Sequence, residues 1–171
     1  EIERYDHIQK QCEEIIDLLS KEKIEKLEIM LSNDIGYRTP KVDVRGVVFD
    51  DMNRILLVKE KVDSKWTLPG GWCDVGLSAS ENAKKEVFEE AGITVEPKNI
   101  IAVLDKSKQS HPSDIFSIYK IFFYCDYIEG EIKKGLETLD VKYFSEFEIP
   151  ELSIPRVSDE QIKMCFDFIK N

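Results

Sequence analysis

Apolar residues recur at two different spacings along the chain, and the spacing changes near residue 39. Before that point, residues 8–19 and 24–31 place apolar side chains at a helical period. The pattern predicts two short helices that end before the breaker at residues 33–36. Such a hairpin buries too little surface to be stable alone, so we expect it to dock on the main body or on a partner subunit.

After Thr39-Pro40 the composition favours strands, because β-branched and aromatic residues gather in short runs separated by turn residues. The runs predict strands at residues 42–49, 54–58, 100–104, 118–127 and 140–144. A turn at Asp50–Asn53 separates the first two runs, which predicts a hairpin.

A long central helix is predicted between the second and third strands. Ser78 and Glu81 have the spacing of a capping box at its start, and Gly92 suits a left-handed stop at its end. We expect three residues on its core side, namely Val87, Phe88 and Ala91. Two small residues, Ala79 and Ala83, are expected beside its carboxylates, where they leave room for ions and a ligand.

A last helix is predicted from a second capping box, Ser158 with Gln161. An apolar stripe follows at Ile162, Cys165, Phe166 and Ile169. Strands flanked by helices in this order predict an α+β fold, with a mixed β-sheet sandwiched between helices. The change of pattern divides the chain into an N-terminal helical extension, residues 1–38, and a main domain, residues 39–171.

Three carboxylates, Glu86, Glu89 and Glu90, share one side of the central helix, directly behind the glycine-rich turn Gly70-Gly71. If they converge in a cleft, they repel one another by about 4 kcal/mol per pair at ~4 Å, so they need a cation. Mg²⁺ and Mn²⁺ prefer oxygen ligands, and the glycines let a phosphate chain approach the backbone. The alternative is a solvated acidic helix face, where each unfavourable spacing costs only about 0.2–0.5 kcal/mol.

The net charge of the chain limits the class of ligand that it can bind. A formal net charge of −10 argues against binding to nucleic-acid backbones, but a small anionic ligand is compatible with it if metal ions supply positive charge. The four cysteines form no Cys-x-x-Cys pair, which argues against a zinc site or a disulfide framework and for reduced thiols in the cytoplasm. We expect no membrane span, because no stretch is apolar for long enough.

The segment from Gly71 to Ile93 resembles the signature box of the Nudix hydrolases. That box is a glycine, five residues, a glutamate, seven residues, Arg-Glu, an aliphatic residue, any residue, Glu-Glu, any residue, a glycine and an aliphatic residue. The matching positions here are Gly71, Glu86, Val87, Glu89, Glu90, Gly92 and Ile93. Two positions depart: Leu77 replaces the first glutamate and Lys85 replaces the arginine, two residues that are understood to brace one another in the family.

The resemblance implies the Nudix fold and a metal-dependent pyrophosphohydrolase, which cleaves a nucleoside diphosphate linked to a moiety X into a nucleoside monophosphate and phosphorylated X. It implies that Glu86, Glu89 and Glu90 hold Mg²⁺, with Mn²⁺ as a substitute, and that one of them can act on the water instead. Glu137 lies where the family's general base or an extra ligand is often found; its alternative is an exposed loop carboxylate. The amino-acid sequence of Gly71–Ser78 resembles that of a Gram-positive subgroup of ADP-ribose and CDP-choline pyrophosphatases.

Residues that select X are harder to predict. Besides Gly70 and Gly71, the candidates are Arg45, which can hold an anion or pair with a neighbouring carboxylate, and Tyr37 and His111, which can stack on a base or contact a phosphate. Weaker candidates for base stacking are Trp72, Phe116 and Tyr119, since aromatic residues mostly fill cores.

Two other functions remain open: a non-catalytic Nudix module that senses a nucleotide, favoured by Leu77 and Lys85, and a hydrolase of oxidised nucleotides or RNA ends. The acidic charge disfavours the RNA substrate. The N-terminal helices predict a homodimer, as in many relatives that cleave sugar nucleotides; the alternative is that they only cover an edge of the main domain.

Overall fold

The computed structural model describes Lys10 and residues 39–170. The chain divides into two units, Glu1–Thr39 and Pro40–Asn171. The predicted helical hairpin and Tyr37 lie outside the described residues, so the hairpin and the boundary after residue 38 stay predictions. The second unit contains, in order, β1 (Lys41–Val47), β2 (Ile55–Glu60), β3 (Trp66–Thr67), α3 (Ala79–Ala91), β4 (Ile93–Asp105), the 3-10 turn η1 (Lys106–Lys108), β5 (Ile118–Gly130), β6 (Thr138–Phe144) and α4 (Asp159–Lys170).

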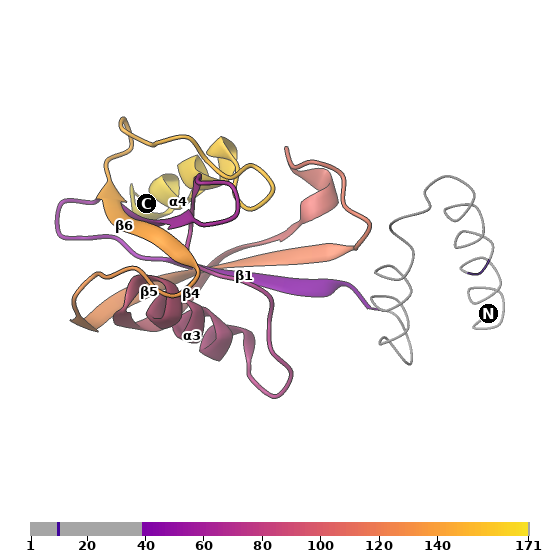
Figure 1. Cartoon of the computed structure of the whole chain (residues 1–171), viewed down its shortest axis with the longest axis horizontal. Helices are drawn as coiled ribbons and strands as arrows, with labels where there is room; N and C mark the ends of the chain where they lie inside the picture. The colour runs from indigo at the N-terminus through magenta and orange to yellow at the C-terminus, as the bar shows by residue number, and fades with distance from the viewer. Residues whose placement is uncertain (1–9, 11–38, 171) are drawn as a thin grey trace. The chain divides into compact units, whose positions relative to one another are not determined.

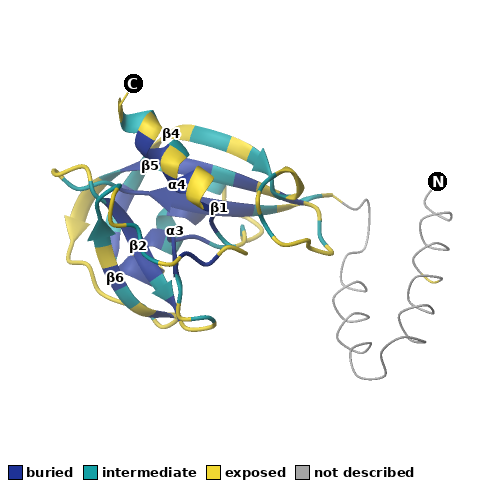
Figure 2. Cartoon of the chain, turned by 90° about the horizontal axis from the view of Figure 1, so that it is seen from above, coloured by how far each residue is buried: buried dark blue, intermediate teal, exposed yellow. Residues whose placement is uncertain are grey.

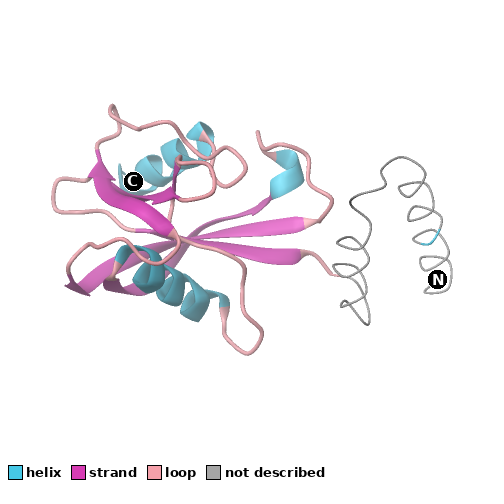
Figure 3. Ribbon diagram, viewed as in Figure 1, coloured by secondary structure: helices cyan, strands magenta, loops and turns pink. Residues whose placement is uncertain are grey.

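The strands form two three-stranded sheets, with orders β1-β5-β4 and β3-β2-β6. The first is mixed, since β1 runs parallel to β5 while β4 is antiparallel to it, and the second is antiparallel. In Figure 1, α3 lies below the sheets and α4 above them, and Figure 3 shows the same layers by secondary structure. The predicted α+β class, with a mixed sheet and flanking helices, is confirmed.

The predicted hairpin around Asp50–Asn53 is present but short: Phe49 bridges Ile55, the Leu56 N–H donates to the Val48 carbonyl and the Asp50 N–H to the Arg54 carbonyl. β1 and β2 belong to different sheets and meet only near the isolated bridge between Phe49 and Ile55. One edge of β1 pairs with β5, and the loop after β3 occupies the other edge, where Val44 donates to the Gly71 carbonyl and Gly46 to the Pro69 carbonyl, both at 2.9 Å. No edge of β1 is left for β2, and the glycine turn is held against β1.

Alternating residues of the same strands fill two separate cores, because successive side chains of a strand point to opposite faces. In β2, Leu56 and Val58 face the core beneath α3, while Ile55 and Leu57 face the core beneath α4. All four are fully buried, which explains the uninterrupted apolar run in this strand. Figure 2 shows the dark, buried centre between the two helices.

The limits of α3 are those predicted. The Ser78 hydroxyl accepts the Glu81 backbone N–H, the Glu81 side chain accepts the Ser78 N–H, and Gly92 ends the helix in the left-handed conformation at φ 76°. Its core side differs from the prediction: Ala83, Val87 and Ala91 are fully buried, whereas the Phe88 side chain is 55% exposed. Ala83, Val87 and Ala91 repeat every four residues and face the strands, so Phe88, one position on, is turned away from them.

The last helix is also confirmed. Ser158 and Gln161 exchange the capping hydrogen bonds before α4, and Ile162, Cys165 and Phe166 are buried in the core. In the described part of the chain, no helix is long and apolar enough to cross a membrane. The cytoplasmic location stays a prediction.

Candidate active site

The glycine turn brings backbone close to both β1 and α3. Gly70 has φ 147°, and a Cβ atom there would lie 2.0 Å from the Val44 carbonyl oxygen. A Cβ atom at Gly71 would lie 3.1 Å from a carboxylate oxygen of Glu86. Glycine is therefore required at residue 70 and leaves free space beside Glu86 at residue 71.

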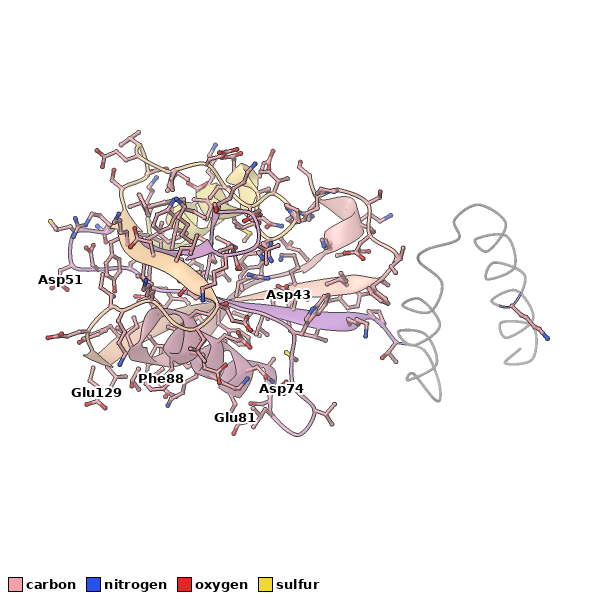
Figure 4. All side chains as sticks on the ribbon, in the orientation of Figure 1. Asp43, Asp51, Asp74, Glu81, Phe88 and Glu129 are labelled. Carbon is pink, nitrogen blue, oxygen red and sulfur yellow. The ribbon has the colours of Figure 1, made fainter. Side chains whose placement is uncertain are left out.

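Asn82 forms hydrogen bonds that hold the loop between Gly71 and Ser78 against the first turns of α3. Its side chain is fully buried; Oδ1 accepts the Asp74 N–H at 2.9 Å, and Nδ2 donates to the Ser78 carbonyl at 3.0 Å. The sequence interpretation missed Asn82, because an asparagine inside a helix has no signature of its own. Figure 4 shows the resulting position of Asp74 near the start of α3, close to Glu81.

Glu86 and Glu90 line a cavity of about 550 Å³, a volume typical of small-molecule sites. Glu90 is only 8% exposed, and its Oε2 accepts the Gly70 N–H at 2.9 Å. Burial raises the pKa of Glu90 to about 8 and also raises the pKa of Glu86. In the described residues no cation lies within salt-bridge distance of Glu90; the Arg45 charge and the Gly70 N–H lower the pKa of this carboxyl, but burial raises it by more.

Glu89 lies at the edge of this site. Its side chain is 53% exposed and it does not belong to the cavity lining. Within the described part of the chain, no three acidic, histidine or cysteine side chains lie close enough to form a metal-binding group. The structure therefore brings Glu86 and Glu90 together at the cavity, while the three-glutamate metal site stays a prediction.

Lys85 lies within salt-bridge distance of three carboxylates, one from the loop and two from α3. Its Nζ lies 2.9 Å from Asp74 Oδ2, 3.3 Å from Glu89 Oε2 and 3.9 Å from Glu86 Oε1. The hydrogen bonds to Asp74 and then to Glu89 raise the pKa of Lys85, so it remains charged at neutral pH.

Several cavity residues come from segments distant in the sequence. Glu137, the predicted base, is on the lining, as is Trp72, which is 50% exposed. The sequence did not predict two other lining residues, Lys106 and Arg156. Lys106 begins η1 and pairs with Asp114 at 2.8 Å, and Arg156 precedes α4. Their place could not be predicted, because folding rather than spacing brings them to the cavity. The full lining is Asp43, Arg45, Glu60, Gly70, Gly71, Trp72, Asp74, Glu86, Glu90, Lys106, Glu137, Pro155 and Arg156.

Arg45 takes the second of its two predicted roles. It is 3% exposed and forms a two-pronged ion pair with Asp43, with Nε–Oδ1 at 2.8 Å and Nη2–Oδ2 at 2.6 Å. Lys120 contacts the same carboxylate at 3.1 Å. Burial opposes ionisation of Asp43, but these two cations hold its pKa below the usual value. Arg45 thus belongs to the cavity wall with its charge already paired.

Among the described residues, three further substrate-binding candidates are not on the cavity lining, namely His111, Phe116 and Tyr119. His111 contacts the Ile154 carbonyl through Nδ1 and the Gln161 amide through Nε2, and burial lowers its pKa. Tyr119 is 44% exposed, and the Phe116 ring contacts Lys41; neither residue lies on the lining. Of the weaker candidates, only Trp72 remains at the site.

Residues 39–164 match the NUDIX domain. The chain belongs to the Nudix family. It is 43% identical over 169 residues to YjhB of Bacillus subtilis (strain 168), a protein named provisionally as an ADP-ribose pyrophosphatase; the match covers 99% of this chain and 81% of that protein.

Two solved Nudix-like structures are also similar. An ADP-ribose pyrophosphatase from Streptococcus suis 89-1591 superposes with a TM-score of 0.70 at 39% identity, over 78% of this chain and 94% of that one. A UDP-X diphosphatase superposes with a TM-score of 0.73 at 29% identity, over 98% of this chain and 81% of that one. The chain is therefore a Nudix hydrolase.

The two departures from the Nudix box lie at the surface of the site. Leu77 is 42% exposed in the loop before α3, and Lys85 pairs instead with Asp74, three residues earlier in the same loop. Nudix hydrolases generally use divalent metal ions. The carboxylate oxygens of Glu86 and Glu90 are suitable donors for such an ion, and the burial of Glu90 without a salt bridge among the described residues favours one there.

Proposed function

We propose that this chain is a divalent-metal-dependent pyrophosphohydrolase that cleaves a nucleoside diphosphate linked to a moiety X, with ADP-ribose as the favoured substrate. The products are a nucleoside monophosphate and phosphorylated X. Membership in the Nudix family supports the reaction type, and two similar proteins carry the name ADP-ribose pyrophosphatase.

One observation carries the proposal: the buried Glu90 carboxylate faces the cavity beside the glycine turn, and no lysine or arginine among the described residues pairs with it. An ionised carboxylate in such a place is unfavourable unless a cation compensates its charge. A diphosphate also needs positive charge, so one divalent ion would satisfy both groups.

Glu86, Glu89 and Glu90 would hold Mg²⁺, or Mn²⁺ in its place. When bound, the ion supplies Lewis acidity toward phosphate oxygens and lowers the pKa of a bound water. Glu89 lies at the edge of the cavity without the ion, so its side chain must turn inward to take part.

The chain's own residues hold the substrate. The Gly70-Gly71 turn leaves the cavity open beside Glu86, so a phosphate chain can lie along the backbone there. Lys106 and Arg156 are on the cavity lining, where Lys106 pairs with Asp114 and Arg156 with Glu60 and Asp63, so either must share its charge with these acids to hold a phosphate. The exposed Trp72 ring offers a surface for a base or a sugar. Glu137 is our choice for the group that takes a proton from the attacking water, because it lies on the lining.

A panel of candidate substrates tests the proposal. The whole chain is incubated with Mg²⁺ and ADP-ribose, CDP-choline, UDP-sugars or 8-oxo-dGTP, and the products are separated and identified. We expect AMP and ribose 5-phosphate from ADP-ribose. Tight nucleotide binding without turnover of any compound would favour the sensing module instead, and turnover of 8-oxo-dGTP alone would favour the oxidised-nucleotide hydrolase.

The predicted homodimer is a separate proposal that concerns the whole chain. Light scattering of the whole chain and of a variant lacking residues 1–36 tests it. A monomer in the first measurement contradicts the homodimer, and a dimer in both contradicts the role given to the N-terminal helices.

A further inference from the structure

Lys85 places one ammonium group among three carboxylates. The contacts lengthen from Asp74 at 2.9 Å, through Glu89 at 3.3 Å, to Glu86 at 3.9 Å. Two of these acids, Glu86 and Glu89, are needed for the divalent ion of the proposed function. Lys85 is therefore a competitor for the same carboxylates, since an ammonium neutralises them and repels a second cation.

Asp74 is the acid that makes the shortest of the three contacts, and it comes from the loop rather than from the helix. Its backbone N–H is fixed by the buried Asn82 side chain, so the position of Asp74 relative to α3 is set by a hydrogen bond rather than by the ion pair itself. The Asp74 carboxylate is 57% exposed, and Asp74, labelled in Figure 4, belongs to the cavity lining.

We propose that Asp74 is a positioning residue, which shares the Lys85 ammonium with Glu86 and Glu89, weakens its contacts with them and so keeps these carboxylates available to the divalent ion. This inference rests on the proposed function. Asp74 makes no contact with the ion in this account; it acts through Lys85.

A double-mutant cycle measured by Mn²⁺ titration calorimetry tests the inference without using activity. The proteins are the wild type, Asp74→Asn, Lys85→Met and the double variant. Without Asp74, Lys85 settles on Glu86 and Glu89, so we expect Asp74→Asn to weaken Mn²⁺ binding about 10-fold, the lower end for residues that support metal ligands. Lys85→Met should bind Mn²⁺ at least as tightly as the wild type, and Asp74→Asn should then have little further effect.

A neighbouring ion pair between α3 and β4 provides the matched control. Lys84 and Glu96 are joined at 3.0 Å with similar exposure, away from the cavity lining. Lys84→Met and Glu96→Gln remove the same kind of exposed pair, so Mn²⁺ affinity should stay within about two-fold of the wild type. Thermal unfolding of all variants checks that the fold is retained.

Two results would overturn the inference. If Asp74→Asn weakens Mn²⁺ binding by the same factor with and without Lys85, Asp74 acts by its own charge. If Lys85→Met itself weakens binding, Lys85 supports the site instead of competing for it. Failure of the proposed function is seen separately, in a wild type that neither binds Mn²⁺ nor hydrolyses any compound of the panel.

Discussion

Helices α3 and α4 cover opposite faces of the sheets but are built for different purposes. α4 has Asp159 and Glu160 in its first turn and Lys170 in its last, the charge order that the helix dipole favours. α3 has no basic residue in its last turn, where Glu89 and Glu90 lie against the dipole. Each helix buries one amide, but α3 also buries a carboxylate, Glu90, whereas the other buried side chains of α4 are apolar.

The contrast shows that α3, unlike α4, contains features that lower the stability of the fold. Charges that oppose the helix dipole and a buried unpaired acid each lower stability, and such features are expected where a site needs them. Changes on α4 should therefore affect mainly folding, and changes on the acidic side of α3 should affect mainly activity.

The largest expected effect compares one phenylalanine from each helix. Phe166 of α4 is 2% exposed and stacks edge-on against Phe49 at 5.2 Å, whereas Phe88 of α3 is 55% exposed. Phe166→Ala should lower the free energy of unfolding by about 3–5 kcal/mol, because it leaves a cavity, and Phe88→Ala by less than about 1 kcal/mol. Urea unfolding measures both, and equal losses would show that the two helices bury their faces alike.

The next effect is on the chemistry. Glu86→Gln keeps the shape of the side chain but removes a ligand charge, so kcat on the substrate found in the panel should fall about 100-fold or more, the equivalent of about 3 kcal/mol. Its free energy of unfolding should not decrease, since burial disfavours the charged form of Glu86. Glu160→Gln on α4 is the control and should leave kcat unchanged. Retained turnover in Glu86→Gln would contradict the claim that the acidic side of α3 serves the chemistry.

A third comparison uses the buried amides of the two helices, Asn82 and Gln161. Each alanine substitution should lower the free energy of unfolding by about 1–3 kcal/mol, because it leaves buried polar groups without partners. Only Asn82→Ala should also lower kcat of the folded protein, since Asn82 fastens the Asp74 loop to α3. Steady-state kinetics below the unfolding transition distinguish the two, and an equal loss of kcat in Gln161→Ala would contradict the account.

The last effect is a change in the slope of stability with pH, and it concerns Lys120, a buried residue on β5 that contacts Asp43. Burial lowers its pKa to about 7 from 10.5. Between these values the unfolded chain binds more protons than the folded one, so stability should rise with pH, by at most about 1.4 kcal/mol per pH unit. Lys120→Met removes this contribution. Urea unfolding at several pH values across the window measures the slopes, and identical slopes in both proteins would refute the assignment.

The limits of α3 could be predicted from the sequence, because its start and stop depend on local chemistry. The capping box at Ser78 and the left-handed Gly92 act within a few residues of one another. The capping box before α4 was predicted for the same reason. Phe88 was misplaced, because a helical period alone does not say which residues at the edge of an apolar face meet the sheet.

Strand limits and pairing were harder to predict. β4 begins at Ile93 rather than Ile100, since Glu96, Pro97 and Lys98 interrupt its apolar pattern, and β3 has only two residues. The partner of β1 depends on which segment occupies its second edge, and that segment is the glycine turn. Pairing of this kind is non-local, so a strand's own residues do not encode it.

The residues of the candidate site also fall into two groups, those that local sequence predicts and those that only the fold brings together. The glycines and the glutamates of the Nudix box could be found from their spacing, and Glu86 and Glu90 meet at the cavity. Lys106, Arg156 and Asp43 could not, because distant segments bring them there. Arg45 and His111 both have hydrogen-bond partners within the protein, and a contact of either residue with X stays a prediction.

The central claim is that the acidic side of α3 holds a divalent cation for diphosphate cleavage. Its most direct test is a crystal of the whole chain grown with Mn²⁺ and a non-cleavable ADP-ribose analogue, with anomalous scattering recorded from manganese. The account predicts a manganese peak bounded by Glu86, Glu89 and Glu90, with the diphosphate beside it. Manganese bound elsewhere, with these three carboxylates turned to solvent, would contradict it.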